Sequence, residues 1–500
     1  MRILRIIACT AAGLALLGAA PASSGSWPAI WMRTPAAPEQ TAAAAAAERS
    51  SRRAAVLAAM TPGEVLVLYG AEARVFSNDV DYPYRQENNF WYLTGINQEG
   101  GSLVLAPDAT PREVLYMPKP NPAQESWTGH QLDAAEATAR SGIAEIRDAA
   151  NFGDVARLVP AGGKLLLLGG RGGSEREYPR EDGVRAELAR AHPDLAVASA
   201  APVFAPLREI KSAAEIALMQ HAVDISAEGH MRAMAMVAPG VWEYQIRAEF
   251  DAVFGMRHAE GWGYPEIVAS GTNPTTLHYE TDQEQIPSQG LMLIDAGAEY
   301  GHMSADVTRT FPITGKFTPE QAAIYNLVYD AQQAMIRTVK PDSPAFGPVG
   351  DAVLIAGLEK LGLITTDPSA PSPPQQLRIW YFHGPSHGMG LAVHDVGGIA
   401  RKPGAIFSME PGLYFRMDTF EEDLPQANSE AWQVFTEKVR PVFEKYRGIG
   451  VRIEDDVLVT PDGCRVLSAA VPSKLKDVEE RYAELHAWVR RHGGPPPLLP

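Results

Sequence analysis

The sequence predicts an α/β protein with two domains, on three observations. The chain has 500 residues, whereas a single hydrophobic core rarely grows beyond about 250 to 300 residues. Hydrophobic residues make up 46% of the chain, which is ordinary for a globular protein. Short apolar runs typical of strands alternate with longer helical patterns along most of the sequence. We therefore expect strands and helices to be mixed in both domains.

Charge and cysteine content narrow the possible partners. The formal net charge is −16, and no run of lysine and arginine is long enough to contact phosphates, so we expect no nucleic-acid partner. The two cysteines are Cys9 and Cys464. Because Cys9 lies in a segment that we expect to be removed, no disulfide is expected, and stability must come from packing.

The N-terminus has the order of a secretory signal peptide, residues 1–25. Arg2 and Arg5 precede an apolar run over residues 6–19, which is followed by small residues ending at Ala22. The run is shorter than the roughly 20 residues that span a bilayer, which disfavours a membrane anchor. We therefore expect cleavage near Ala22 and a periplasmic or secreted protein that has no membrane attachment after processing.

A first domain is expected over residues 51–205. Residues 26–50 before it are rich in alanine and proline, which indicates a linker or the lead-in to a helix. Within the domain, strand-like runs alternate with helical patterns, as in an α/β fold. The strand-like runs cover residues 64–69, 102–105 and 164–168, and a helical pattern covers residues 131–140.

A second domain is expected over residues 206–475. Pro202 and Pro206 precede a long helical pattern, which places the boundary near residue 205. A further helix and a low-complexity tail follow over residues 476–500. Inside the domain we expect helices over residues 212–237, 242–254 and 318–339, and strands over residues 291–296 and 304–313.

The last two strands form an expected hairpin that carries a pair of acids. Folding it about a tight turn near Tyr300 and Gly301 sets Asp295 opposite Asp306. Like charges in that position are destabilising unless a cation lies between them. Taken alone, such a pair more often faces solvent or caps a turn, so it does not by itself indicate a metal site.

Two further acids lie in apolar strand contexts. Glu410 follows the run AIFSM, and Glu454 lies within GIGVRIEDDVLVT. An unpaired charge in such a place costs several kcal/mol, roughly, to bury. Period-2 alternation places Arg452 on the same face as Glu454, so these two could form a structural ion pair. That pairing does not explain why four acids recur in apolar strands.

A group of histidines supplies nitrogen donors to the same half of the chain. His383, His387 and His394 fall within HGPSHGMGLAVHD, and His278 lies in NPTTLHYE. Pro385 and the neighbouring glycines argue against a helix, so this is not the helical HExxH zinc motif. A single histidine is usually a satisfied polar residue, whereas three within twelve positions indicate a site.

These motifs resemble the proline-peptidase branch of the methionine aminopeptidase and prolidase superfamily, and aminopeptidase P within it. The likeness covers nearly the whole chain after the signal peptide, and residues 77–95 (SNDVDYPYRQENNFWYLTG) resemble the N-terminal domain that accompanies aminopeptidase P. The resemblance implies an N-terminal α/β domain followed by a catalytic domain with the pita-bread fold. The family's five metal ligands match Asp295, Asp306, His387, Glu410 and Glu454 in order.

The resemblance also implies a role for each ligand. Asp295 would bind one metal ion through both oxygens, Asp306 and Glu454 would bridge the two ions, and His387 and Glu410 would complete the other site. Glu410 would also act as the proton shuttle. Four carboxylates and one imidazole balance two divalent ions, and a hydroxide bridging them would be the nucleophile. Oxygen-rich ligation favours Mn²⁺, with Co²⁺, Zn²⁺ or Fe²⁺ as alternatives.

Five further residues receive supporting roles from the resemblance. His278, His383 and His394 would donate hydrogen bonds to the substrate, and Arg452 and Tyr414 would support the ligands.

The resemblance implies hydrolysis of the bond between an N-terminal residue and a following proline. Proline lacks an amide N–H and fixes φ, so proteases that bind substrate as a strand lose a contact there. Ser386 in HGPSH resembles aminopeptidase P more than prolidase, the dipeptidase that is the nearest alternative. A metal-free pita-bread binding module is a third possibility, although such relatives typically lose ligands.

Two more expectations follow. Family likeness implies a dimer or a tetramer. Residues 417–448 form a span longer than usual, so we expect an insertion near the mouth of the site that restricts substrate length.

Overall fold

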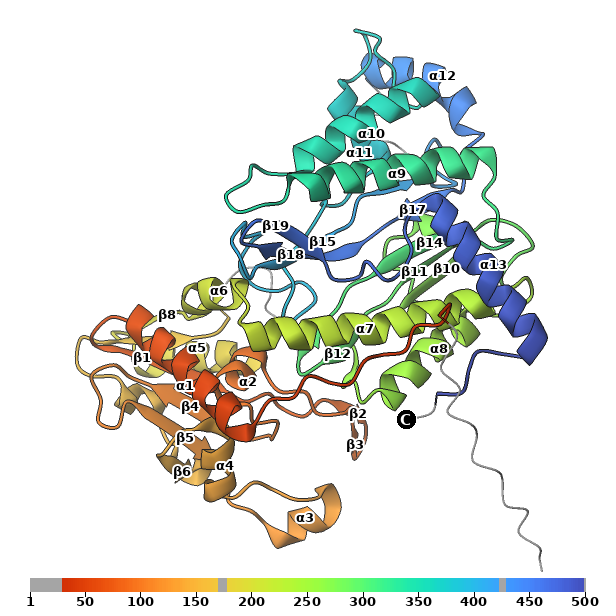
Figure 1. The fold of residues 1–500 in the computed structure, drawn as a ribbon. Helices are drawn as coiled ribbons and strands as arrows, with labels where there is room; N and C mark the ends of the chain where they lie inside the picture. Colours follow the sequence, from red (N-terminus) through yellow and green to blue (C-terminus); the bar gives the residue numbers. More distant parts are fainter. Residues whose placement is uncertain (1–28, 170–177, 422–428, 499–500) are drawn as a thin grey trace, which may run out of the picture.

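The computed structural model describes residues 29–169, 178–421 and 429–498. The expected signal peptide lies outside these residues. Within them, every helix is too short or too polar to cross a bilayer. Figure 1 shows two parts, an N-terminal unit of residues 42–209 in red to yellow and a C-terminal unit of residues 210–498 in green to blue.

The N-terminal unit is built around a mixed six-stranded sheet. Its strand order is β6-β5-β4-β1-β7-β8. The central strand β1 pairs antiparallel with β4 and parallel with β7, and buried apolar side chains cover both of its faces. The strands are β1 (Glu64–Tyr69), β4 (Ser102–Leu105), β5 (Glu113–Met117), β6 (Ile146–Asp148), β7 (Lys164–Leu167) and β8 (Ala196–Ser199). Three of them occupy the runs predicted at residues 64–69, 102–105 and 164–168.

Helices and one separate hairpin complete this unit. The predicted helix over residues 131–140 corresponds to α4, which begins at the capping box of Asp133 and Glu136. A short hairpin, β2 (Val75–Ser77) with β3 (Val80–Asp81), stands apart from the main sheet. The helices are α1 (Ala42–Ala59), α2 (Asn88–Thr94), α3 (Pro122–Thr128), α4 (Ala134–Ser141), α5 (Pro179–Ala191) and α6 (Ala201–Glu209).

The described part of the alanine- and proline-rich segment is ordered by contacts with the C-terminal unit. Trp31 is buried against Trp488, and Thr34 donates two hydrogen bonds to Glu228. From Ala42 onward the chain is helical. The predicted boundary at residue 50 therefore falls inside α1, and the one near residue 205 falls inside α6.

A long helix, α7 (Ala213–Met236), follows the junction. It begins at a capping box of Ser212 and Glu215 and is buried along most of its length. Glycine at position 229 lets Phe250 of α8 pack tightly, since a Cβ there would lie 2.5 Å from the phenylalanine ring. In Figure 1, α7 and α8 lie below β10, β11, β15 and β18, α9, α10 and α11 lie above these strands, and β12 lies below α7.

The C-terminal unit contains several small antiparallel sheets between these helices. β11 lies between β10 and β14, and β16 pairs with β17. The helices are α8 (Glu243–Met256), α9 (Pro319–Thr338), α10 (Gly347–Leu361), α11 (Pro373–Trp380), α12 (Glu430–Phe443) and α13 (Leu475–His492). The strands are β9 (Gly261–Trp262), β10 (Ile267–Gly271), β11 (Leu291–Asp295), β12 (Ala298–Tyr300), β13 (Met303–Ser304), β14 (Thr308–Pro312), β15 (Ile406–Met409), β16 (Gly412–Tyr414), β17 (Gly450–Arg452), β18 (Asp455–Thr460) and β19 (Gly463–Val466).

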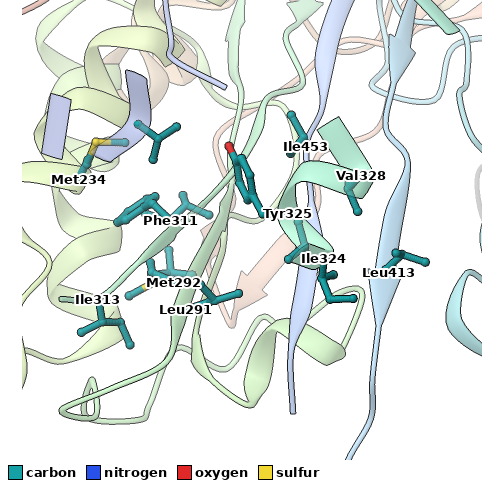
Figure 2. Close-up of a cluster of buried hydrophobic side chains, with 14 of the residues drawn as sticks. Met234, Leu291, Met292, Phe311, Ile313, Ile324, Tyr325, Val328, Leu413 and Ile453 are labelled. Carbon is teal, nitrogen blue, oxygen red and sulfur yellow. The ribbon is translucent and has the colours of Figure 1, made fainter. Parts of the chain in front are cut away.

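One apolar core joins the strands to the helices of this unit. Figure 2 shows Leu291 of β11 and Phe311 of β14 on one side of Tyr325 of α9, and Val328 of α9 on the other. The Tyr325 hydroxyl donates to the carbonyl of Ser473 at 2.6 Å, so its polar end is satisfied at the edge of the core. This packing fixes the two strands that carry the acids described below.

Residues 417–448, where we expect an insertion, contain α12, which packs on an aromatic cluster. Phe435 and Phe443 contact Trp380, the last residue of α11, and Trp432 contacts Phe435. Figure 1 shows α12 near the top of the view, with α10 and α11 below it. Residues 422–428 lie outside the described residues.

Candidate metal centre

A cavity of about 430 Å³ in the C-terminal unit collects the predicted site residues. Nine of the ten line it, and the tenth, Tyr414, is fully buried behind them. The nine are His278, Asp295, Asp306, His383, His387, His394, Glu410, Arg452 and Glu454. None of the described residues of the segment 417–448 lines this cavity, and its position at the mouth stays a prediction.

The hairpin that carries the two aspartates has a different register from the predicted one. Asp295 ends β11 and lies opposite Thr308, and not opposite Asp306. The turn is formed by Gly301 and His302, whose φ angles are +59° and +61°. Two consecutive positive φ values are typical of a type I′ turn, which suits the strand twist. Histidine is an uncommon residue there, so nothing in the sequence marked a turn one residue further along.

Tyr264 brings the two aspartates together in spite of this register. Its hydroxyl lies 2.5 Å from Asp295 Oδ1 and 2.6 Å from Asp306 Oδ1. Burial and the neighbouring carboxylates raise the pKa of Tyr264 well above its ordinary value, so the phenol stays protonated. No local sequence pattern marks this residue, which lies in an irregular segment 31 positions before Asp295.

His387 is positioned by the strand that leads to Glu410. The His387 amide donates to Ser408 Oγ at 3.0 Å, and the Ser408 amide donates to the His387 carbonyl at 2.9 Å. The Glu410 amide donates to the carbonyl of Pro385 at 3.0 Å. As predicted, residues 383–395 contain no helix. These ladder-like bonds place the His387 ring beside the Glu410 carboxylate.

Glu454 enters the cavity from the segment between β17 and β18. Thr308 donates from Oγ1 to Glu454 Oε2 at 2.8 Å, and the Glu454 amide donates to the Thr308 carbonyl at 3.1 Å. The other oxygen, Oε1, is buried and has no hydrogen-bond partner among the described residues. It lies 3.8 Å from His387 Nε2, on the side where the other acids gather.

Three acidic side chains lie close to His387 and to one another. Its Nε2 lies 3.4 Å from Asp306 Oδ2 and 3.6 Å from Glu410 Oε1. Burial lowers the pKa of His387, but the hydrogen bond and charge of Asp306 outweigh it and raise that pKa to about 9. Burial, together with Asp306 and Asp295, raises the pKa of Glu410 to about 7. Burial and the same neighbours hold the pKa of Glu454 well above its usual range.

Arg452 forms its ion pair with Asp295, and not with Glu454 as the alternative interpretation proposed. Its Nη2 lies 2.6 Å from Asp295 Oδ2, and its Nη1 donates to the Tyr414 hydroxyl at 3.0 Å. Burial acts to raise the pKa of Asp295, but Arg452 outweighs it and keeps that pKa below its ordinary value. The guanidinium therefore compensates Asp295, whereas Asp306, Glu410 and Glu454 share the single imidazole of His387 as their cationic neighbour.

The three supporting histidines differ in how they are bound. His383 has both nitrogens engaged, with Nε2 2.8 Å from the Tyr414 hydroxyl and Nδ1 2.7 Å from the Gly384 carbonyl. His394 packs edge-on against His387, with ring centroids 4.1 Å apart. For His278 and His394 the described residues provide no hydrogen-bond partner, so their nitrogens are open to the cavity.

The donor set fits divalent metal ions. Ligand atoms of Asp306, His387 and Glu454 lie within 4.8 Å of one another, and Glu410 and Asp295 adjoin them through His387 and Tyr264. Raised carboxylate pKa values and the unpartnered Glu454 oxygen both indicate a deficit of positive charge that such ions would supply. Carboxylate oxygens with one imidazole are typical ligands of divalent ions.

Two protein-family models match this chain. Residues 217–461 match the model of metallopeptidase family M24, and residues 50–164 match that of the aminopeptidase P N-terminal domain. The two matches fall on the two units described above.

Individual relatives and solved structures are similar to this chain over most of its length. The chain is 32% identical to the Xaa-Pro aminopeptidases of Haemophilus influenzae and Escherichia coli, over 85% of this chain and 94% and 95% of theirs. The structure of aminopeptidase P from E. coli with the inhibitor Pro-Leu matches with a TM-score of 0.76 at 30% identity, over 90% of this chain and 100% of that one. The chain belongs to metallopeptidase family M24, in its aminopeptidase P branch. The predicted family and fold class are confirmed.

Proposed function

We propose that this chain is a metallo-exopeptidase that hydrolyses the bond between an N-terminal residue and a penultimate proline. The observation that carries the proposal is the meeting of the five predicted ligands, from distant parts of the C-terminal unit, around one cavity. The Xaa-Pro aminopeptidases that resemble it over most of its length favour this activity over that of an Xaa-Pro dipeptidase.

Asp295, Asp306, His387, Glu410 and Glu454 would hold two divalent ions. Bound there, such ions lower the pKa of water to generate a nucleophile and polarise the scissile carbonyl. We propose Mn²⁺ as the resident ion because oxygen donors dominate the set. Aminopeptidase P of E. coli has been solved in a zinc-substituted form, so a relative accepts a different ion.

We assign the proton transfer to Glu410. Burial raises the pKa of its carboxyl to about 7 in the metal-free chain, and divalent ions held beside it would lower that pKa. Its Oε2 lies 3.5 Å from His383 Nδ1. In the proposed reaction Glu410 accepts the proton of the attacking water and delivers it to the proline nitrogen, which leaves as an amine.

The substrate is bound by histidine nitrogens that have no hydrogen-bond partner among the described residues. Since Tyr414 and Gly384 occupy both nitrogens of His383, we assign the donors facing the peptide to His278 and His394. Arg452 holds Asp295 and Tyr414 in place through an ion pair and a hydrogen bond, and its guanidinium stays buried beside the cavity. A proline substrate needs no strand-like pairing in such a site, because it has no amide N–H to donate.

Two further features belong to the proposal. The order of basic, apolar and small residues at the N-terminus supports export to the periplasm or the medium. Family likeness supports a dimer or a tetramer.

The test compares an Xaa-Pro-Xaa tripeptide with an Xaa-Pro dipeptide on purified mature protein, with and without a chelator. We expect tripeptide hydrolysis that the chelator abolishes and Mn²⁺ restores. Asp306→Asn should lower kcat/KM by about 100-fold or more, because a ligand charge is lost. Asp330→Asn, at an exposed position of α9, is the matched control and should leave it unchanged. Chelator-resistant activity, or full activity in Asp306→Asn, would refute the proposal.

A further inference from the structure

The segment that carries three of the site histidines has little regular structure of its own. Residues 383–395, called here the histidine loop, run between α11 and β15 without a helix. Its first half is paired with β15 through His387 and Ser408. Its second half, which contains His394, requires other partners to hold one conformation.

One such partner is Arg85 of the N-terminal unit. Its guanidinium donates from Nε and Nη2 to the carboxylate of Glu299 at 2.7 to 2.9 Å, and Nη2 also donates to the Leu391 carbonyl at 2.8 Å. Glu299 lies on β12, which follows directly after the strand that ends at Asp295. A single guanidinium therefore ties the acid-bearing hairpin to the histidine loop.

A second partner, Arg208 of α6, lies on the other side of His394. It forms a buried ion pair with Asp395, the residue next to that histidine. Both arginines are oriented by neighbouring residues at the start of α2: Asn88 accepts from Arg85 at 2.9 Å and Asn89 accepts from Arg208 at 2.9 Å.

We propose that the N-terminal unit positions the active site through these two arginines, with Arg85 and Arg208 as positioning residues for the histidine loop. The inference rests on the proposed function and deepens it. Leu391 and Asp395 bracket His394, so the two arginines fix the loop on both sides of that histidine. The Ser304 amide donates to the Gly390 carbonyl at 2.9 Å, so the same part of the loop also contacts the hairpin two residues before Asp306.

Arg85 is the better of the two for a test. Its side chain is 41% exposed, so a polar replacement is solvated, whereas removing the buried Arg208 would leave Asp395 as an unpaired buried charge. Arg85→Gln removes both contacts. Arg85→Lys keeps the charge near Glu299, but an ammonium group lacks the planar fork that reaches the carboxylate and the Leu391 carbonyl together.

The matched control is Arg52→Gln. Arg52 of α1 also crosses between the units, pairing with Glu215 of α7 at 3.2 Å, and it has no contact with the histidine loop. For each variant we would measure the thermal midpoint, kcat and KM for the tripeptide, and the Kd for Mn²⁺ by calorimetry on metal-free protein.

We expect Arg85→Gln and Arg85→Lys to lower kcat by about tenfold or more, because His394 faces the peptide. Mn²⁺ binding should weaken by a similar factor, because Arg85 also holds the hairpin that carries Asp295 and Asp306. Arg85→Lys should show both effects with a thermal midpoint close to that of the unmodified protein. Arg52→Gln should lower the midpoint alone. Unchanged kcat and Mn²⁺ affinity in Arg85→Gln, or full restoration by lysine, would overturn the inference. If the unmodified protein binds Mn²⁺ but cleaves no Xaa-Pro bond, the proposed function fails, and the Kd values still test the positioning role.

Discussion

At the scale of single residues, Glu266 is a buried acid that the proposed reaction does not use. It is 3% exposed, and its Oε1 has no hydrogen-bond partner among the described residues. The nearby Arg247 is paired with Asp282 at 3.0 Å. Burial, with a smaller contribution from Asp251, raises the pKa of Glu266 to about 7.

This pKa predicts how Glu266→Gln changes stability with pH. The unfolded chain releases the proton near pH 4.5 and the folded chain near pH 7, so Glu266 destabilises the fold increasingly as pH rises between these values. Removing the charge should stabilise the protein, and the gain in the free energy of unfolding should be greater at pH 8 than at pH 5 by about 2 kcal/mol. Denaturant melts at both pH values measure this gain.

The exposed Glu437 of α12 supplies the control for that measurement. Glu437→Gln should show no such dependence on pH. An equal effect of Glu266→Gln at pH 5 and pH 8 would contradict the assignment of a raised pKa.

Some site residues are marked by a local sequence pattern and others are not. Glu410 and Glu454 stood out because charged residues in apolar strands are costly unless paired. Tyr264 and Thr308 are ordinary residues in their local sequence, and they contact the acids only because of strand register and packing. Such roles depend on long-range pairing, which no local pattern encodes.

Among the helices and strands, α12 packs against the end of α11 and stabilises it. Phe435 is fully buried and packs against Trp380 and Phe420. Trp380 lies three residues before His383, so α12 supports the start of the histidine loop from outside the cavity.

Phe435→Ala should therefore destabilise the protein without altering substrate choice. Loss of a buried phenylalanine costs about 3 to 5 kcal/mol in the free energy of unfolding. The ratio of kcat/KM for a tripeptide to that for a longer Xaa-Pro peptide should stay constant, because α12 does not line the cavity. Urea melts and paired kinetic assays check both expectations. A selective gain for longer peptides would instead favour the earlier expectation that the insertion restricts substrate length.

The elements themselves were largely predictable, and their pairing was not. The helices expected over residues 212–237, 242–254 and 318–339 correspond to α7, α8 and α9, because long apolar periodicity and capping residues are local signals. The hairpin register was wrong because it depends on the φ angles of Gly301 and His302.

At the scale of the whole molecule, the acid-lined cavity makes stability depend on bound cations. Several buried carboxylates face one another there, and their charges are compensated only in part by Arg452. Any ligand that binds the folded chain alone shifts the unfolding equilibrium toward it.

Metal-free protein should therefore melt at a lower temperature than metal-loaded protein. At a free Mn²⁺ concentration of about 1,000 times Kd, the gain in the free energy of unfolding should be about 4 kcal/mol. Thermal melts across a Mn²⁺ titration at constant ionic strength measure it, and Asp306→Asn should reduce the shift. A midpoint independent of Mn²⁺ would show that the cavity does not hold the ion.

The contact between Trp31 and Trp488 has a consequence for synthesis of the chain. These side chains lie 6.3 Å apart, edge to face, although 457 positions separate them in sequence. A ribosome adds roughly 5 to 20 residues per second, so Trp31 emerges well before its partner exists. Thr34 can bond Glu228 as soon as α7 has been made, but Trp31 can pack against Trp488 only when translation is almost complete. The growing chain therefore lacks a finished C-terminal core until its last helix has been made.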